Sequence, residues 1–281
     1  MTFEALKQMK RMKVKFRGSA SLILLLGTLA IFLLANVLSP YGPNEIGVGD
    51  HFAPPSGAHL FGTDNLGRDL LSRILFGGRI TVLIALGATS IALILGSAWG
   101  ILAGIRGGWI DEFLMRTADA LMAVPLILFA LFCISALGSS VASLILVAGI
   151  LLSPSTARMA RSAVKAELAS PYVVSAVASG FSKVRLVWNE VMVNIAPQLL
   201  VQISINAASA VMLEATLSFV GFGLQPPNAS LGTLILQGYA QIYNSIWFVL
   251  FPVITVMMTI LVFNNYGEQL RLSLDSKRSS S

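Results

Sequence analysis

The sequence predicts an all-α polytopic membrane protein with about six transmembrane helices, and three observations support this fold class. Of the 281 residues, 56% are hydrophobic and only 11% are charged, which is too few charges to cover the surface of a soluble domain. The charges cluster, so several runs of roughly 18 or more residues are almost uncharged, and such runs cross a bilayer. The net charge of +6 comes from basic residues that flank these runs, which indicates membrane topology rather than nucleic-acid binding.

Six apolar segments predict the transmembrane helices in order. The first, residues 20–37, is longer than the core of a signal peptide, which has about 7–15 residues. We therefore expect a retained span, with cleavage as the alternative. The other predicted spans are residues 80–105, 113–137, 140–158, 194–220 and 246–264.

Lysine and arginine predict the side of the membrane on which each connection lies. Residues 1–19 hold six basic side chains and one acidic one, so we expect the N-terminus in the cytoplasm. The basic segment 159–193 and the tail 269–281 then also lie in the cytoplasm. Residues 20–79 form the first span and an extracytoplasmic loop, and residues 80–268 form a transmembrane core that includes the segment 159–193.

The predicted outer loop carries a dense mixture of charges between residues 61 and 78. Apolar residues recur at helical spacing from Leu66 onward, which predicts a short amphipathic helix at the outer interface. In the alternative interpretation the charges only solvate a loop and anchor the next span. The charged residues in question are Asp64, Arg68, Asp69 and Arg73.

Two acidic residues fall inside predicted spans, where acids are functional candidates by default. Asp119 follows Arg116 at a spacing that permits a local ion pair, and a polar contact with a partner helix is the alternative. Glu214 lies near the outer end of the fifth span, where it serves a function or bonds to the adjacent segment LSFVGFG. Gly221 and Gly223 in that segment predict a close-packed, non-helical return.

The cytoplasmic segment 159–193 is much longer than the usual connection of about 2–8 residues between helices. Pro171 can begin a helix, and Gly180 can end it with a sharp bend before a second helix. Such a compact knob suits docking into a groove of another protein, although a mere connector is the alternative.

Motifs for catalysis, nucleotides and metals are missing from the sequence. There is no GxxxxGK[ST] loop, no HExxH and no Ser/His/Asp arrangement. The two histidines have no cysteine nearby, and the single cysteine, Cys133, excludes an intrachain disulfide. We therefore expect neither an enzyme, a cofactor nor a metal site.

Three ordered signatures resemble the inner-membrane permeases of ABC importers, in particular the C-type subunit of the dipeptide, oligopeptide and nickel group. They are FGTDNLGRDLLSRIL, LEATLSFVGFGLQPPNASLGTLI and FNNYGEQLRLSLD, and the resemblance covers essentially the whole chain. It implies a five-helix core with an extra N-terminal span in the bacterial inner membrane. It also implies four kinds of partner: a homologous second permease, two ATPase subunits, an extracytoplasmic solute-binding protein and membrane lipid.

The resemblance also implies roles for residues. The family's EAA motif corresponds to Val174, Ser175 and Ala176, with Gly180 after it, so the usual acid is absent here. The implied ATPase-coupling residues are Tyr172, Ser175, Ala176, Gly180 and Lys183. The implied residues at the binding-protein site or outer gate are Asp64, Arg68, Asp69 and Arg73, with Asp119 and Glu214 as intramembrane polar residues.

The expected function is passage of di- or oligopeptides through an ATP-driven importer, with hydrolysis on separate chains. The same role for nickel or a metal chelate is the first alternative. A stand-alone channel or secondary carrier is the second, but such carriers often show repeats and broken helices that this sequence does not clearly contain.

Overall fold

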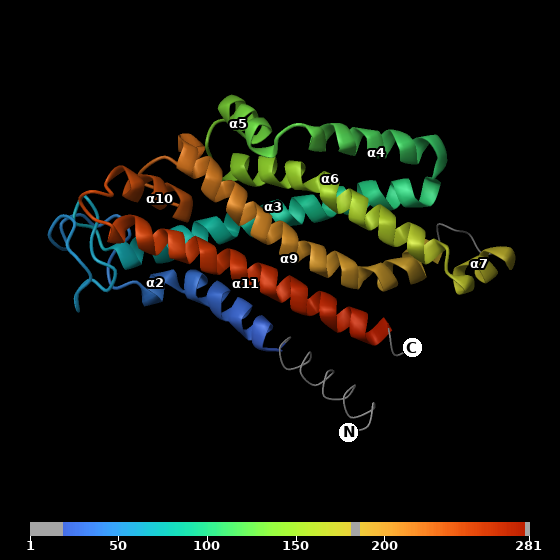
Figure 1. Cartoon of the computed structure of the whole chain (residues 1–281), viewed down its shortest axis with the longest axis horizontal. Helices are drawn as coiled ribbons and strands as arrows, with labels where there is room; N and C mark the ends of the chain where they lie inside the picture. Colours follow the sequence, from blue (N-terminus) through green and yellow to red (C-terminus); the bar gives the residue numbers. More distant parts are fainter. Residues whose placement is uncertain (1–18, 181–185, 279–281) are drawn as a thin grey trace, which may run out of the picture.

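Long apolar helices run side by side through the molecule (Figure 1). The computed structural model describes residues 19–180 and 186–278. A helix of residues Ser19–Leu33 comes first. The helices that follow are α2 (Ala35–Leu38), α3 (Leu70–Arg106), α4 (Gly108–Ala123), α5 (Leu126–Leu137), α6 (Val141–Leu168), α7 (Pro171–Ala178), α9 (Met192–Leu217), α10 (Leu231–Ala240) and α11 (Trp247–Arg278).

Helices α3 and α6 lie closest together, because small residues face each other along their contact. A Cβ atom added at Gly100 would lie 2.2 Å from the carbonyl oxygen of Ala157, and one added at Gly96 would lie 2.6 Å from the carbonyl oxygen of Ser153. Membrane helices pack in this way because apolar side chains gain little by leaving lipid, whereas close backbone approach gains dispersion energy.

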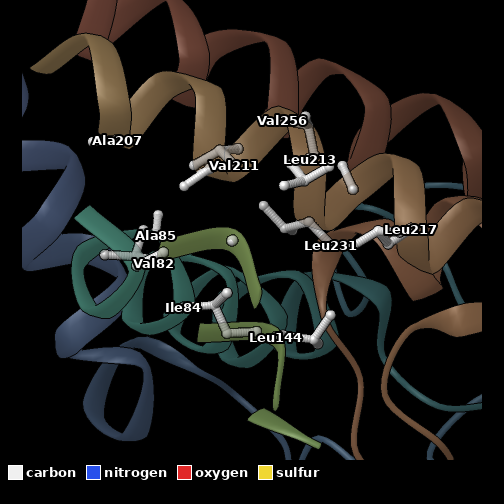
Figure 2. Packing of buried hydrophobic residues seen from close by; sticks show 14 of the residues in the cluster. Val82, Ile84, Ala85, Leu144, Ala207, Val211, Leu213, Leu217, Leu231 and Val256 are labelled. Carbon is white, nitrogen blue, oxygen red and sulfur yellow. The ribbon is translucent and has the colours of Figure 1, made fainter. Parts of the chain in front are cut away.

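The apolar core forms where α3, α6, α9, α10 and α11 meet (Figure 2). Figure 2 shows side chains from all five helices pointing toward one another. The labelled members are Val82, Ile84 and Ala85 of α3, Leu144 of α6, Ala207, Val211, Leu213 and Leu217 of α9, Leu231 of α10 and Val256 of α11.

Four helices of the described chain are long and apolar enough to cross a membrane: α3, α6, α9 with its extension to Phe222, and α11. A fifth span results if α4 and α5 count as one, although they meet at 87°. The expected count of six is not confirmed, because the described part of the first helix, Ser19–Leu33, is shorter than a full span. The all-α membrane fold class is confirmed.

The structure corrects the predicted interfacial helix. Residues 62–69 form turns in which Gly62 and Gly67 have φ angles of +80° and +68°, so the helical spacing from Leu66 becomes a helix only from Leu70, as the start of α3 rather than as a separate short helix. Asp69 caps α3, which continues from Leu70 to Arg106 without a break. Asp69 and Arg73 therefore belong to the start of the same helix that forms the predicted second span.

Two other boundaries differ from the prediction. The third predicted span, 113–137, breaks at Pro125, because proline lacks the N–H that would continue α4. The fourth predicted span, 140–158, continues as α6 to Leu168. The first ten residues of the predicted cytoplasmic segment, 159–168, are therefore helical. A π-helical turn, Ser218–Phe222, extends α9 and contains Gly221, whose φ angle of +97° is not helical. The predicted non-helical return follows it at residues 223–230.

The two ends of the bundle differ. At one end, on the left of Figure 1, lie the loop of residues 39–69 and helix α10; we call this the loop end. At the other end, on the right, lie α7 and the C-terminus of α11; we call this the α7 end.

Candidate functional sites at the two ends of the bundle

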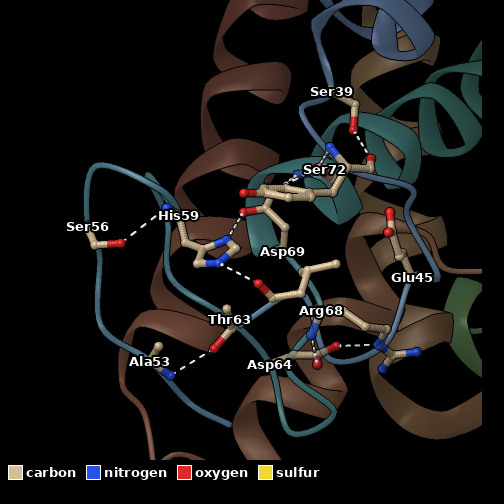
Figure 3. Close-up of polar contacts among 12 residues, drawn as sticks. Ser39, Glu45, Ala53, Ser56, His59, Thr63, Asp64, Arg68, Asp69 and Ser72 are labelled. Atoms are coloured by element: carbon tan, nitrogen blue, oxygen red, sulfur yellow. Dashed lines mark hydrogen bonds and ion pairs between the residues drawn. The ribbon is translucent and has the colours of Figure 1, made fainter. Parts of the chain in front are cut away.

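Asp64 is the centre of a buried ionic network at the loop end (Figure 3). Its Oδ1 accepts from the backbone N–H groups of Leu66 and Arg68 at 2.8 and 3.0 Å. Its Oδ2 accepts from Arg68 Nε and Arg73 Nη1, both at 2.6 Å. The Asp64 side chain is 0% exposed and that of Arg73 is 2% exposed, so the interpretation of these charges as a solvated loop is wrong.

Asp69 forms a second buried cluster beside the first. It accepts from the backbone N–H of Ser72 at 2.8 Å and from the Ser72 hydroxyl at 2.7 Å, which caps α3. Its Oδ1 also lies 3.0 Å from Nδ1 of His59, whose Nε2 faces the carbonyl oxygen of Val48 at 3.2 Å (Figure 3). Sequence reasoning missed this role of His59, because only its lack of metal partners was considered.

Arg73 links the loop to helix α10. Its Nη1 donates to Oε1 of Gln237 at 3.1 Å, in addition to its bond with Asp64. Gln237 is 164 positions away in sequence, so no local pattern could have identified it. The loop, the first turn of α3 and α10 are therefore held together by one guanidinium group.

Glu214 is the second tie between these helices and is 1% exposed. Its Oε2 accepts from the Thr81 hydroxyl of α3 at 3.0 Å, and its Oε1 accepts from the Ser218 hydroxyl at 2.7 Å. Thr81 Oγ1 in turn accepts from the backbone N–H of Leu231 at 3.1 Å, at the start of α10. The carboxyl group bonds to side chains, from α3 and from the segment after α9, rather than to the LSFVGFG backbone.

Helix α10 is held against its neighbours by glycine contacts as well. A Cβ atom at Gly232 would lie 2.7 Å from the Cα of Ala215, and one at Gly238 would lie 2.5 Å from the carbonyl oxygen of Phe248. The backbones of α9, α10 and α11 therefore touch, which leaves α10 little freedom to slide. Movement of α10 would require its polar ties to α3 to change.

At the α7 end, the predicted short helix and glycine bend are present. Pro171 occupies the first turn of α7, and Gly180 has a φ angle of +92°. Val173 is 1% exposed and packs in a small apolar cluster with α3, α6 and α9 residues, whereas Tyr172 and Ser175 face outward. Lys183 lies outside the described residues.

Tyr172 joins α7 to the helices on either side. Its hydroxyl donates to Oε1 of Glu167 at 2.6 Å and accepts from Nδ2 of Asn194 at 2.9 Å. Asn194 also donates to the same glutamate oxygen at 2.8 Å. Burial raises the pKa of Tyr172, and the bond to Glu167 raises it further. Asn194 and Glu167 thus fix the base of α7 on α9 and α6.

Ion pairs form within α4 and between α4 and α6. Arg116 pairs with Glu112, four residues earlier, at 2.6 Å, so the expected pair of Arg116 with Asp119 is wrong. Asp119 instead meets Arg158 of α6, as the partner-helix alternative expected. Both i−3 and i−4 spacings bring helical side chains together, and Asp119 lies within reach of the neighbouring helix.

Known proteins resemble the chain in both sequence and fold. A probable D,D-dipeptide transport system permease protein, DdpC of Escherichia coli (strain K12), is 34% identical over 253 residues, covering 89% of this chain and 85% of that protein. The dipeptide transport system permease protein DppC of Alkalihalophilus pseudofirmus is 32% identical over 277 residues, or 99% and 90% of the two chains.

The fold matches a chain of the methionine ABC transporter MetNI in inward-facing crystal forms. The TM-score is 0.59 at 16% identity, and the match covers 72% of this chain and 95% of that chain. A family model also matches residues 96–271, which include α6, α9, α10 and most of α11. The chain belongs to the family of binding-protein-dependent transport system inner membrane components.

Proposed function

We propose that this permease moves di- or oligopeptides across the bacterial inner membrane. The observation that supports this is similarity to a dipeptide permease over 99% of the chain, which includes the loop end as well as the core. In the proposed complex, a homologous second permease completes the pathway, two ATPase subunits supply energy and an extracytoplasmic binding protein delivers the peptide.

The two ends of the bundle have different proposed roles. The α7 end faces the cytoplasm together with both termini, in agreement with the lysine and arginine bias. There α7 docks on an ATPase subunit through the outward side of Tyr172, Ser175 and Ala176, with Gly180 providing the bend and Lys183 following it. Tyr172, Glu167 and Asn194 connect α7 to α6 and α9, so closure of the ATPases would move those helices.

The loop end faces outward and receives the binding protein. Asp64, Arg68, Asp69 and Arg73 shape the loop that forms this surface, and Arg73 passes its position to α10. The outer gate then lies where α10 meets α3 and α9, with Glu214 at its base. The proposed importer alternates between two states that ligand and ATP favour differently.

Transport by the reconstituted complex tests this proposal. The chain is placed in lipid vesicles with its neighbouring permease, the ATPase chains and the binding protein, and uptake of a radiolabelled dipeptide is measured with and without ATP. We expect ATP-dependent uptake that an ATPase-inactive variant abolishes, with nickel uptake as the comparison. Solute movement by the purified chain alone, without ATP, would refute the proposal.

A further inference from the structure

His59 is held at both of its ring nitrogens at the loop end. Its Nδ1 lies 3.0 Å from Oδ1 of Asp69, and its Nε2 lies 3.2 Å from the carbonyl oxygen of Val48 (Figure 3). Asp69 caps α3, whereas Val48 belongs to the loop of residues 39–69. The imidazole ring therefore bridges the loop and the first turn of α3.

Both partners of the ring are acceptors. A carboxylate oxygen and a backbone carbonyl oxygen have no proton to donate, so each of the two bonds needs an N–H of the ring. A neutral imidazole carries one N–H, and an imidazolium carries two. The protonated ring therefore satisfies both contacts, whereas the neutral ring turns a lone pair toward one of the two acceptors.

Burial keeps water from replacing a lost bond. His59 is 7% exposed, and a Cβ atom added at Gly49 would lie 2.6 Å from its Nε2, so the loop backbone lies directly against this nitrogen. The ring of Tyr41 lies alongside, with the two ring centroids 5.1 Å apart. An unsatisfied buried polar group costs more free energy than a made bond gains. The protonation state of His59 therefore affects how firmly the loop is held.

Asp69 is the charged group that faces the ring. Its Oδ1 contacts His59 from the cap of α3. Tyr41, from the segment after α2, is the other ionisable group in contact with the ring within residues 19–180 and 186–278. The remaining charged groups of the buried network pair with one another: Asp64, Arg68 and Arg73. A second proton on His59 therefore lies next to a carboxylate.

We infer that His59 positions the loop in its protonated form, so that the loop end is held more firmly at acidic pH. Histidine gains and loses its second proton between about pH 5 and 8. Both bonds form at the acidic end of this range, and one of them is lost as the pH rises. The stabilisation of the loop is therefore present at low pH and disappears toward high pH.

The contact of His59 with Val48 fixes a part of the loop surface. The N–H groups of Val48 and Gly49 both donate to the carbonyl oxygen of Gly67, at 3.1 and 3.2 Å. Residues 44–47 come directly before this point and are exposed, with Ile46 66% exposed. Docking of the binding protein at this end should therefore depend on pH through His59. This consequence rests on the proposed function, whereas the two bonds of the ring do not.

The first measurement follows the histidines of the chain by NMR. The full chain, with isotope-labelled histidine, is purified through a tag without histidine and placed in lipid nanodiscs. Because the chain has two histidines, the spectrum contains two imidazole signals, and His51→Gln assigns them. We expect His59 to be an imidazolium at about pH 5 and a neutral ring at about pH 8. A ring that stays neutral at the lower pH, or protonated at the higher, would overturn the inference.

The second measurement follows the loop by hydrogen–deuterium exchange on the same particles. The reporters are the amide protons of Val48 and Gly49, with rates corrected for the intrinsic effect of pH. We expect them to be about 2-fold to 10-fold better protected at the acidic pH, which is the factor that one hydrogen bond typically contributes. His59→Gln cannot take a second proton and should remove this pH dependence. Equal dependence in the wild type and in His59→Gln would overturn the inference.

His51→Gln is the matched control for the exchange measurement. His51 lies in the same loop, is exposed, and has its Nδ1 2.8 Å from the carbonyl oxygen of Asn65. This variant should keep the pH dependence of the wild type. Loss of the dependence in His51→Gln, with its retention in His59→Gln, would refute the role of His59.

A third measurement separates this inference from the proposed function. In the reconstituted complex, the concentration of binding protein that gives half-maximal stimulation of ATP hydrolysis is compared at the two pH values. We expect it to be about 2-fold to 10-fold higher at the alkaline pH in the wild type, and to change less in His59→Gln. Protection of the loop that depends on pH, without this difference between the two proteins, would support the role of His59 and refute docking of the binding protein at the loop end.

Discussion

Single buried polar residues determine how the loop end of this apolar bundle is held together. Asp64, Asp69 and Glu214 are each at most 1% exposed, and each accepts at least two hydrogen bonds. Buried polar groups are retained only when they are bonded, because an unsatisfied group costs much more than a bond gains. These three carboxyl groups therefore specify one arrangement of loop, α3 and α10.

Glu214 provides the clearest test at this scale. Glu214→Leu leaves the hydroxyl groups of Thr81 and Ser218 without their acceptor, at a cost of about 1–3 kcal/mol for each unsatisfied group. Glu214→Gln keeps one acceptor oxygen and should be milder. We expect the thermal midpoint of the purified protein, and its transport activity, to fall more for Leu than for Gln.

Thr216→Val is the matched control for this prediction. Thr216 lies on the same helix, and within the described part of the chain its side chain bonds only to the carbonyl oxygen of Met212 in its own helix. Its replacement should leave both measurements close to those of the wild type. If Glu214→Leu also behaved like the wild type, the carboxyl group would not hold α10 in place.

At the scale of elements, backbone contact at small residues explains why α3 and α6 form the centre of the bundle. A side chain at Gly100 would collide with the backbone of α6 rather than with a movable side chain. Relief of the collision requires the two helices to separate, and overpacking of this kind typically costs about 1–3 kcal/mol. Gly100→Ala should therefore lower the thermal midpoint.

Gly27→Ala is the control for that substitution. No atom of residues 19–180 or 186–278 lies within 4 Å of a Cβ atom added at Gly27, in the helix Ser19–Leu33. Alanine is a better helix former than glycine by about 0.8–1 kcal/mol, so Gly27→Ala should leave the midpoint unchanged or raise it. Equal loss of stability in both variants would show that the α3–α6 contact is not the cause.

Helix α7 leads to a second prediction about an element. No atom of the described residues lies within 4 Å of a Cβ atom added at Gly180, so Gly180→Val acts through its φ angle of +92°, which a β-branched residue adopts only with strain. Ala176→Trp acts instead through bulk at the proposed docking face. Both variants should keep the bundle folded but lose the ATPase on co-purification, or keep it with hydrolysis uncoupled from uptake.

Gly138→Val is the control for the backbone effect, since Gly138 has a φ angle of +79° and equally open surroundings outside α7. It should carry a similar strain without loss of the ATPase. Full coupling in both Ala176→Trp and Gly180→Val would mean that the motor docks elsewhere.

At the scale of the whole molecule, composition and charge clustering were enough to predict the membrane fold class and the order of the long helices, and the positions of Pro171 and Gly180 predicted the short helix and the glycine bend after it. The sequence did not predict that α4 and α5 meet at 87° at Pro125, nor that α3 begins at Leu70. Tertiary contacts decide where a helix with an apolar pattern begins and ends. The site was predictable only in part: the sequence singled out the charged stretch that holds Asp64 and Arg68, whereas Arg73 with Gln237 and Glu214 with Thr81 join distant segments.

The orientation of the whole molecule gives the last prediction. Basic residues in segments near the α7 end imply that this end is cytoplasmic and that the loop end is outside. In a Cys133→Ala background, which removes the single cysteine, Asn228→Cys and Ser179→Cys place one exposed thiol at each end. An impermeant maleimide applied to intact spheroplasts should label Asn228→Cys, and should label Ser179→Cys only after the membrane is opened.

Two comparisons make the labelling result decisive. Ala58→Cys lies in the exposed part of the loop and should behave like Asn228→Cys, since both belong to the loop end. Cys133→Ala alone should remain unlabelled. Labelling of Asn228→Cys and Ser179→Cys from the same side would contradict a bundle that spans the membrane between its two ends. Labelling of Ser179→Cys alone in intact spheroplasts would show the inverse orientation. The proposed docking surfaces would then be exchanged, with the ATPases at the loop end and the binding protein at the α7 end.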